Sequence, residues 1–435
     1  MLVGEQKEVE PVRIIQQPPF LHLHPSPEVS YERLKPTLYA LLNRLSKKSQ
    51  IVIHDVPPCV MPDAVESLSF EPAERVRVPA CASCSMNAVC KGVPQKFMEH
   101  NNPAAFQPWQ NNPRELTIEV NRACMFACPF CFYKNYYLHN DKLAPPKEKI
   151  FELIDQAVAL GTTTIRLFGG DPLLRKDLMD ILDYAKQKGQ FILMNTNGIF
   201  KDQKHMREVL DKADLLIISL HGFDVESEHV LTGRGDFMKK ILLNLRRATA
   251  YAPEKIRIST LVTTYVVNNF WKYARIISAL GIQYWGLNRP MVSQAELQQY
   301  PWLQVKKEDV LLLAKNIQQF RNNSGISVKL NNYPWCMFPE ELYAVLDHNG
   351  AYNGVTRFVY DIKGYFKPSV SMNTNLGTSA KEAWQQNPFA ASTHSFLSKE
   401  CQQCPVVRQC NGGSRTLAQE ATGSWSGKDP WMQNQ

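Results

Sequence analysis

Three closely spaced cysteines, Cys124, Cys128 and Cys131, are the residues of this chain best suited to chemistry. Their C-x3-C-x2-C spacing directly follows the apolar, strand-like segment 116–120. Soft thiolates at such short separations are typical ligands of iron–sulfur clusters, and a cubane needs four ligands. Three cysteines would leave one iron open to a small molecule, which favours a catalytic cluster. A zinc site is the alternative, but zinc sites usually pair two-residue gaps with a nearby histidine or fourth cysteine.

The other eight cysteines form two copies of one pattern. Each copy has a C-x2-C-x5-C triplet and one more cysteine upstream in a P-x-C-x-x-P context. The two sets are Cys59, Cys81, Cys84 and Cys90, and Cys336, Cys401, Cys404 and Cys410. Such a repeat indicates two modules of one kind. Sets of three, four and four account for all 11 cysteines, so the simplest prediction is three 4Fe–4S clusters, one open and two ligated by protein alone.

Zinc remains an alternative for both repeated sets, because C-x2-C is a common half of a zinc site. Cys59 is the least secure ligand, since a cysteine with apolar neighbours is often a core residue.

Short apolar runs alternate with helical periodicity from about residue 114, and these elements would position the cysteines. The predicted strands are 116–120, 164–168, 191–195, 215–219, 256–262 and 282–288. Between them, apolar residues recur on one helical face; examples are Ile150, Leu153, Ile154, Ala157 and Val158, and Leu178, Ile181, Leu182 and Ala185. Six βα units in series predict an α/β fold with a parallel sheet and right-handed crossovers. When such βα units curve into a TIM-type barrel, catalytic groups lie at the carboxyl ends of the strands. Cys124, Gly169, Asn195 and Ser219 all fall at or just past predicted strand ends.

The cysteine motif, with Phe130 before its last cysteine, resembles the signature of the radical S-adenosylmethionine (radical SAM) enzymes. The resemblance covers roughly residues 114–330 and includes Gly169-Gly170-Asp171-Pro172, which is similar to the family's GGEP motif with aspartate in place of glutamate. It implies a partial (β/α)6 TIM-type barrel whose cluster chelates SAM through its open iron. It also implies an external one-electron reductant, because one electron from the cluster cleaves SAM to a 5′-deoxyadenosyl radical.

By the same resemblance, residues at the strand ends are predicted to contact SAM. Two glycines let a backbone approach a ligand closely, and short polar side chains could hydrogen-bond the ribose or carboxylate of SAM. The predicted SAM-binding residues are Phe130, Gly169, Gly170, Asp171, Pro172, Asn195, Asn197, Ser219 and His221. Turn or capping roles are the alternative for the polar residues. Related SPASM-type enzymes often carry an arginine where this chain has Leu231, and Arg234 is the candidate substitute.

Three domains are predicted: an N-terminal extension with a cysteine module at 1–113, the radical SAM partial barrel at 114–330, and a C-terminal domain at 331–435. The last resembles the twitch or SPASM extensions that hold auxiliary clusters, although it has too few cysteines for a complete SPASM domain. A hairpin of 355–361 with 364–370 and a short helix around 381–384 are predicted within it. No separate leader-binding domain is expected, because residues 1–40 are short and proline-rich.

Composition limits the location and partners of the chain. Its 435 residues are 44% hydrophobic and 21% charged, values typical of a soluble globular protein. No apolar stretch reaches the ~20 residues of a membrane span, and no signal-peptide core is present near Met1. We therefore expect a cytoplasmic protein with reduced cysteines and no membrane partner. The net charge of +8 is modest, and the pairs Lys239-Lys240 and Arg246-Arg247 favour a solvated helix face over a nucleic-acid surface.

These observations predict an enzyme of the oxidoreductase or lyase type. The favoured substrate is a ribosomally synthesised peptide, modified by backbone cleavage, splicing or crosslinking, since two auxiliary modules would extend the surface around the barrel mouth. A small partner protein could then deliver the precursor. The alternatives are a radical SAM dehydrogenase or cofactor-biosynthesis enzyme acting on a small metabolite, and a non-catalytic iron–sulfur electron carrier. The sequence indicates no particular catalytic acid or base.

Overall fold

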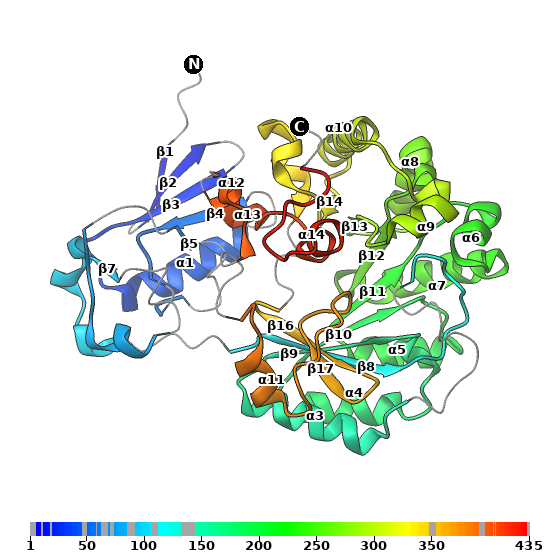
Figure 1. The fold of residues 1–435 in the computed structure, drawn as a ribbon, viewed down its shortest axis with the longest axis horizontal. Helices are drawn as coiled ribbons and strands as arrows, with labels where there is room; N and C mark the ends of the chain where they lie inside the picture. The colour runs from blue at the N-terminus through cyan, green and yellow to red at the C-terminus, as the bar shows by residue number, and fades with distance from the viewer. Residues whose placement is uncertain are drawn as a thin grey trace. The chain divides into compact units, whose positions relative to one another are not determined.

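The computed structural model divides the chain into two compact units. One comprises residues 1–111 with 339–344, and the other comprises 112–338 with 345–435. We call them the N-terminal unit and the barrel unit and describe each by itself (Figure 1). The structure describes residues 6–9, 12–17, 20–45, 50–57, 59–61, 68–69, 74–84, 92–106, 112–131, 144–347, 354–390, 396–402, 404 and 406–432.

A ten-stranded sheet organises the barrel unit, in the order β15-β14-β13-β12-β11-β10-β9-β8-β16-β17. Every neighbouring pair is parallel except β16 and β17. The strands are β8 (Glu115–Asn121), β9 (Thr164–Gly169), β10 (Phe191–Thr196), β11 (Leu215–Ser219), β12 (Ile256–Leu261), β13 (Tyr284–Asn288), β14 (Ser327–Asn331), β15 (Leu346–Asp347), β16 (Arg357–Asp361) and β17 (Tyr365–Lys367).

Helices connect these strands and follow the outer side of the curved sheet (Figure 1). They are α3 (Lys147–Ala159), α4 (Leu178–Gln187), α5 (Gln203–Lys212), α6 (Val225–Thr232), α7 (Met238–Tyr251), α8 (Thr264–Ala279), α9 (Gln294–Gln299) and α10 (Lys307–Ser324). The C-terminal segment adds α11 (Ala380–Gln386), α12 (Lys399–Gln402), α13 (Val407–Cys410) and α14 (Arg415–Thr422). Within the described ranges, no helix combines the length and apolarity needed to cross a bilayer.

The predicted α/β partial barrel is confirmed, because β8 to β13 match the six predicted strands and form one open, parallel series. The apolar face of α3 is buried from Ile150 to Ala157, and the predicted face of α4 is buried throughout. The prediction for Val158 was wrong, since 38% of this residue is exposed. It lies about 100° around the helix from Ala157, which turns its side chain away from the sheet. The basic pairs of α7 are exposed, as expected.

The C-terminal segment joins the barrel sheet directly. The predicted hairpin forms between β16 and β17, with shorter strands than expected, and the predicted short helix is α11. The sequence did not predict that β16 pairs in parallel with β8, where Arg357 lies opposite Glu115. Residues of both predicted later domains, 114–330 and 331–435, therefore belong mostly to one compact unit.

The N-terminal unit is built on a five-stranded sheet in the order β1-β2-β3-β4-β5. Its strands are β1 (Gln6–Val9), β2 (Val12–Gln17), β3 (Phe20–Pro25), β4 (Gln50–His54) and β5 (Leu68–Ser69), with a separate pair β6 (Arg75–Val76) and β7 (Val93–Pro94). Helix α1 (Tyr31–Leu45) contributes Leu34 and Leu38 to a core shared with Leu23 and Ile53. The described residues between 6 and 40 thus contribute strands and a helix to a folded unit, which their proline content did not lead us to expect.

Candidate functional site

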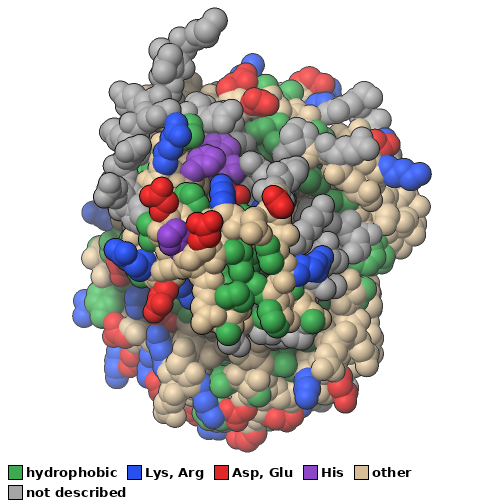
Figure 2. Space-filling view, turned by 90° about the vertical axis from the view of Figure 1, so that its left-hand side faces the viewer, with side chains coloured by type: hydrophobic (Ala, Val, Ile, Leu, Met, Phe, Trp, Pro, Cys, Tyr) green, Lys and Arg blue, Asp and Glu red, His purple; other side chains and the backbone are tan. Residues whose placement is uncertain are grey.

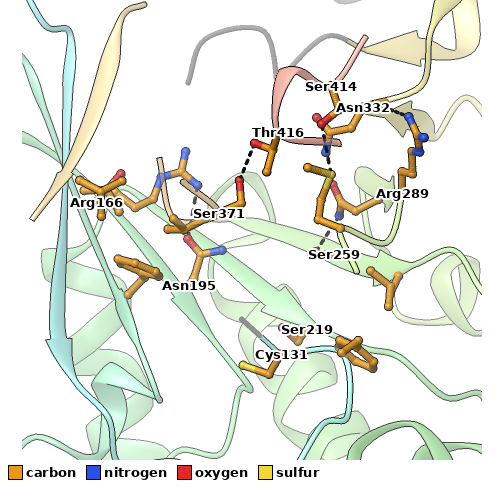
Figure 3. Close-up of a pocket in the computed structure, with 18 of the residues that line it drawn as sticks. Cys131, Arg166, Asn195, Ser219, Ser259, Arg289, Asn332, Ser371, Ser414 and Thr416 are labelled. Atoms are coloured by element: carbon orange, nitrogen blue, oxygen red, sulfur yellow. Dashed lines mark hydrogen bonds between the residues drawn. The ribbon is translucent and has the colours of Figure 1, made fainter. Parts of the chain in front are cut away.

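A cavity of about 440 Å³ extends from the carboxyl ends of the barrel strands into the barrel unit (Figure 3). Two groups of residues face each other across it. One comes from the loop after β8 and the ends of β9 to β11, and we call it the loop half: Cys124, Cys128, Phe130, Cys131, Gly169, Gly170, Asn195, Thr196, Asn197, Ser219 and His221. The other comes from β12 to β14 and the C-terminal segment, and we call it the tail half: Ser259, Asn288, Arg289, Met291, Asn332, Tyr333, Trp335, Ser371, Met372, Cys410, Asn411, Gly413, Ser414, Arg415 and Thr416.

The three cysteines of the C-x3-C-x2-C motif all line the loop half. The Sγ of Cys124 accepts hydrogen bonds from the Phe126 N–H and the Asn197 side-chain amide, both at 3.4 Å. Burial raises the pKa of Cys124 to about 11, and burial with the neighbouring Cys131 and Cys124 raises the pKa of Cys128 well above its ordinary value. Three thiolates this close in a buried site need a positive centre to be stable, so the donor set fits a metal cluster.

The Gly169–Asp171 turn touches the cysteine loop backbone to backbone. Gly169 has φ 144°, and a Cβ at Gly170 would lie 2.0 Å from the Ala123 carbonyl oxygen. The N–H of Gly170 donates to Asn121 (2.8 Å) and the N–H of Asp171 donates to Ala123 (2.7 Å). Only glycine allows this approach, and the turn thereby fixes the start of the cysteine loop.

Asp171 is 1% exposed and, with Pro172, lies behind the cavity wall instead of lining it. Its carboxylate accepts from the Thr196 hydroxyl (2.7 Å), the Asn197 N–H (3.1 Å) and the Leu173 N–H (3.1 Å). Burial raises the pKa of Asp171 to about 6, although these donors oppose the rise. The geometry gives Asp171 a positioning task, because it holds the β10 end that carries Asn197 toward Cys124.

Helix α6 anchors the middle of the cysteine loop. The Ala127 N–H donates to the Thr232 carbonyl (2.9 Å), and the Arg234 guanidinium donates to the Met125 carbonyl (3.2 Å). Leu231, at the position where an arginine was considered, is fully buried. Arg234 pairs mainly with Asp236 and does not line the cavity. Sequence reasoning missed Thr232, since a carbonyl contact between distant segments leaves no motif.

The remaining predicted side chains, Phe130, Asn195, Ser219 and His221, all line the loop half. Asn195 and Ser219 are labelled in Figure 3. Phe130 packs edge-on against His221, with ring centroids 4.9 Å apart. Burial lowers the pKa of His221 to about 4, so the ring is neutral at neutral pH, and its Nδ1 accepts from the Leu261 N–H (3.3 Å). Asn195 accepts from Arg166 (3.3 Å).

The C-terminal cysteine set is brought together at the tail half. Burial raises the pKa of Cys336 to about 11, and the neighbouring Cys401 and Cys404 add to the rise. Burial likewise raises the pKa of Cys410 to about 12, with Cys336 and Cys401 again among its neighbours, while the Trp335 N–H donates to its sulfur (3.3 Å). All four predicted ligands are therefore neighbours, and Cys410 lines the same cavity as Cys131.

The N-terminal cysteine set is described only in part. Cys59 and Cys81 both pack against the core of the N-terminal unit, and Cys84 follows the short helix Pro79–Ser83. Cys90 lies outside the described residues. The fourfold site with Cys59, Cys81, Cys84 and Cys90 stays a prediction.

The arginines that line the cavity are engaged by protein groups. Arg166 makes a two-pronged contact with Glu115, at 2.7 and 3.1 Å. Burial alone would raise the pKa of Glu115, but the charges of Arg166 and Arg357 and the hydrogen bonds from Arg166 and Thr117 outweigh it and lower the pKa to about 2. The charges at this end of the cavity are thus mutually compensated.

The arginines of the tail half are also paired with other groups of the protein. Arg289 contacts both carboxylate oxygens of Asp429 (3.0 and 2.8 Å), and both side chains are almost fully buried. Arg415 donates to backbone carbonyls, namely those of Phe396, Gly412, Trp425 and Gly427. Neutral hydroxyl and amide groups, among them Ser371, Thr416 and Ser414, therefore provide much of the hydrogen-bonding surface (Figure 3).

Comparison with known proteins agrees with this geometry. Residues 118–275 match the model of the radical SAM superfamily. A curated relative from Saccharolobus solfataricus named "Probable GTP 3′,8-cyclase" is 28% identical over 170 residues, which cover 39% of this chain and 54% of the relative. A relative of the same name from Thermoplasma volcanium is 34% identical over 122 residues, covering 27% and 36%. The match to S. solfataricus thus spans about half of that relative's length.

Solved structures with this fold cover more of the chain. Streptococcus suis SuiB bound to precursor peptide SuiA superposes with a TM-score of 0.57 at 17% identity, over 73% of this chain and 75% of SuiB. The enzyme anSMEcpe with bound AdoMet and Cp18Cys peptide gives 0.58 at 17% identity, over 74% and 94%. Together with the cysteine loop and the glycine turn, the family match identifies residues 118–275 as a radical SAM domain, the domain of a superfamily whose enzymes use a 4Fe–4S cluster and SAM.

Proposed function

We propose that this enzyme modifies a ribosomally synthesised peptide, by backbone cleavage, splicing or crosslinking. The observation that carries the proposal is the character of the tail half. Its polar groups are mainly neutral hydroxyls and amides, and its arginines are engaged by Asp429 or by backbone carbonyls. Neutral donors and acceptors suit the N–H and C=O groups of a peptide backbone.

We assign the 4Fe–4S cluster that serves SAM to Cys124, Cys128 and Cys131. The cluster and SAM, when bound, supply a 5′-deoxyadenosyl radical that abstracts hydrogen from the substrate. The chain's own residues orient the reactants. Asn197 donates to Cys124, and the neutral His221 ring packs against Phe130 beside Ser219. Gly169 and Gly170 line the cavity beside the cysteine loop, where their backbone carbonyls can accept from the amino group of SAM.

We assign a second, protein-ligated cluster to Cys336, Cys401, Cys404 and Cys410, and a third to Cys59, Cys81, Cys84 and Cys90. Because Cys410 and Cys131 line one cavity, the second cluster would lie beside the substrate. Held there by these cysteines, the cluster would supply an acceptor for an electron from a substrate radical, or an anchoring point for the peptide. An external one-electron reductant and a small precursor-delivering protein complete the proposed system.

A second candidate is favoured by the names of the curated relatives, which are GTP 3′,8-cyclases. In this reading the enzyme acts on a small metabolite in cofactor biosynthesis. A nucleoside triphosphate carries several negative charges and calls for arginine or lysine side chains. Each arginine among the described residues of the cavity wall already has a carboxylate or carbonyl partner or lies beside Glu115, which weighs against this candidate.

One experiment separates the candidates. Reconstituted enzyme is incubated anaerobically with SAM, a reductant, and either GTP or the peptide encoded by a short open reading frame beside its gene. We expect 5′-deoxyadenosine and a peptide of changed mass to form in a fixed molar ratio, and we expect no GTP turnover. Conversion of GTP with unchanged peptide mass would overturn the peptide proposal, and release of no 5′-deoxyadenosine at all would favour an electron carrier.

A further inference from the structure

We propose that His22, His24 and His54 in the N-terminal unit bind a divalent transition-metal ion, with zinc as the preferred occupant. Among the described residues, these three form the group of histidine, cysteine or acidic side chains whose ligand atoms all lie within 4.8 Å of one another. Figure 2 shows histidine side chains gathered in one patch on the face that it presents. The inference is independent of the function proposed for the barrel unit.

Strand register brings the three rings to one face of the sheet. Residues 21–24 read Leu–His–Leu–His, and side chains alternate between the two faces of a strand. β3 and β4 are parallel, with His22 opposite Val52 and Leu23 opposite Ile53. Continuing that register by one residue sets His24 beside His54. Leu23 and Ile53 are buried in the core on one face of the sheet. The three imidazoles therefore lie on the face that points away from this core.

The rings already touch one another. The Nδ1 of His22 and the Nε2 of His54 are 2.7 Å apart and share a hydrogen bond. The rings of His24 and His54 stack with centroids 4.1 Å apart, and those of His22 and His54 with centroids 5.0 Å apart. His54 is 5% exposed, while His22 and His24 are partly exposed, so the cluster is preorganised on its inner side and accessible from outside.

The donor set selects the class of metal. Neutral imidazoles suit zinc, copper and nickel, whereas magnesium and calcium prefer oxygen ligands. Tetrahedral zinc at Zn–N distances of about 2.0–2.1 Å separates its nitrogens by about 3.3 Å. The His22–His54 pair, whose nitrogens are 2.7 Å apart, must open slightly to reach that separation.

Three protein ligands leave the fourth zinc position for water or an added ligand. Arg13 lies opposite His24 on β2, but its side chain is exposed and can keep its charge in solvent. The site contains nitrogen donors only, which distinguishes it chemically from the thiol sites proposed for iron–sulfur clusters.

The test uses full-length, anaerobically reconstituted enzyme, so that cysteines are occupied by iron. Zinc is added against a competing chelator, and bound zinc and iron are counted by elemental analysis. We expect about one zinc per chain in addition to iron. His24→Asn and His22→Asn should each lower zinc affinity by at least about 100-fold, since even losing an outer hydrogen-bond partner of a ligand costs 10- to 100-fold. His100→Asn, at an exposed histidine of the same unit, should leave it unchanged.

Cobalt(II) serves as a spectroscopic probe that distinguishes nitrogen from sulfur ligands. Ligand-field bands without thiolate-to-cobalt charge transfer are expected in the wild type and should be absent in His24→Asn. Equal iron content and equal circular dichroism would show that the variants are folded. The proposal is overturned if folded His22 and His24 variants bind zinc as tightly as the wild type, or if the cobalt spectrum reports thiolate ligation.

Discussion

The two halves of the cavity are built in different ways. The loop half comes from one run of consecutive βα units, and Asp171 after β9 holds Thr196 at the end of the neighbouring strand β10. The tail half comes from segments far apart in the chain, as where Asp429 binds Arg289 across 140 residues. Local contacts leave motifs in the sequence, and distant contacts do not. The halves should also separate in function, the first serving SAM and the second the substrate.

The largest expected effect tests the loop half. Replacing Cys124, Cys128 and Cys131 by alanine should remove about four irons per chain, as expected for one cubane, and abolish release of 5′-deoxyadenosine. The matched control replaces Cys336, Cys401 and Cys404, which should also remove about four irons but leave SAM cleavage in place. Retained cleavage in the first variant would contradict the assignment, and loss of cleavage in the control would erase the functional distinction between the halves.

Asp429→Asn tests whether the tail half depends on its distant ion pair. It leaves the buried guanidinium of Arg289 uncompensated, and breaking a buried pair costs about 3–5 kcal/mol. Denaturant unfolding should report this loss. Asp236→Asn is the control, because its pair with Arg234 is largely exposed. Equal stability of the two variants would mean that the tail half is held by other contacts.

Gly170→Ala tests the close contact between the glycine turn and the cysteine loop. The added Cβ meets the Ala123 carbonyl at 2.0 Å, so the backbone must shift, at a cost near the upper end of the usual 1–3 kcal/mol for overpacking, about 3 kcal/mol. The affinity for SAM should fall as well, because the shifted backbone belongs to the loop half. Gly189→Ala has open space around its Cβ and carries only the strain of φ 71°. If both variants bind SAM as tightly as the wild type, the turn has no part in the loop half.

The smallest expected effect is a pH dependence from His221. Its folded-state pKa of about 4 lies below the ordinary 6.5 because burial disfavours the charged ring. The lowered pKa of His221 adds to the free energy of unfolding above pH 6.5, and this contribution is lost as the pH falls toward 4. At pH 5 this loss amounts to about 2 kcal/mol. His221→Asn keeps an acceptor for the Leu261 N–H, and its stability should depend less on pH, whereas the exposed His229→Asn should behave as the wild type. Parallel curves for all three proteins between pH 7 and pH 5 would refute this role of His221.

Much of the fold could be predicted, because six alternating apolar runs and helical faces are local patterns. The loop half could be predicted in outline, because Cys124 and Gly169 belong to recognisable motifs and lie at the ends of predicted strands. The task of Asp171 could not be foreseen, since sequence does not reveal whether a carboxylate faces the cavity or the wall behind it. Arg289 and Asp429 lie too far apart in the chain for any spacing rule to connect them. The alternating His22 and His24 were a visible signal, but His54 joins them only through strand register.

The pairing of β16 with β8 has a consequence for how the protein is made. β8 is the first strand of the barrel to leave the ribosome, yet one of its edges finds its partner only after residues 357–361 have been synthesised. Until then that edge presents unsatisfied backbone groups to other chains. A polypeptide that ends before β16 should therefore aggregate during expression, even though it contains every cysteine of the loop half. Restoring the hairpin as a separate peptide should reduce that aggregation by occupying the edge of β8.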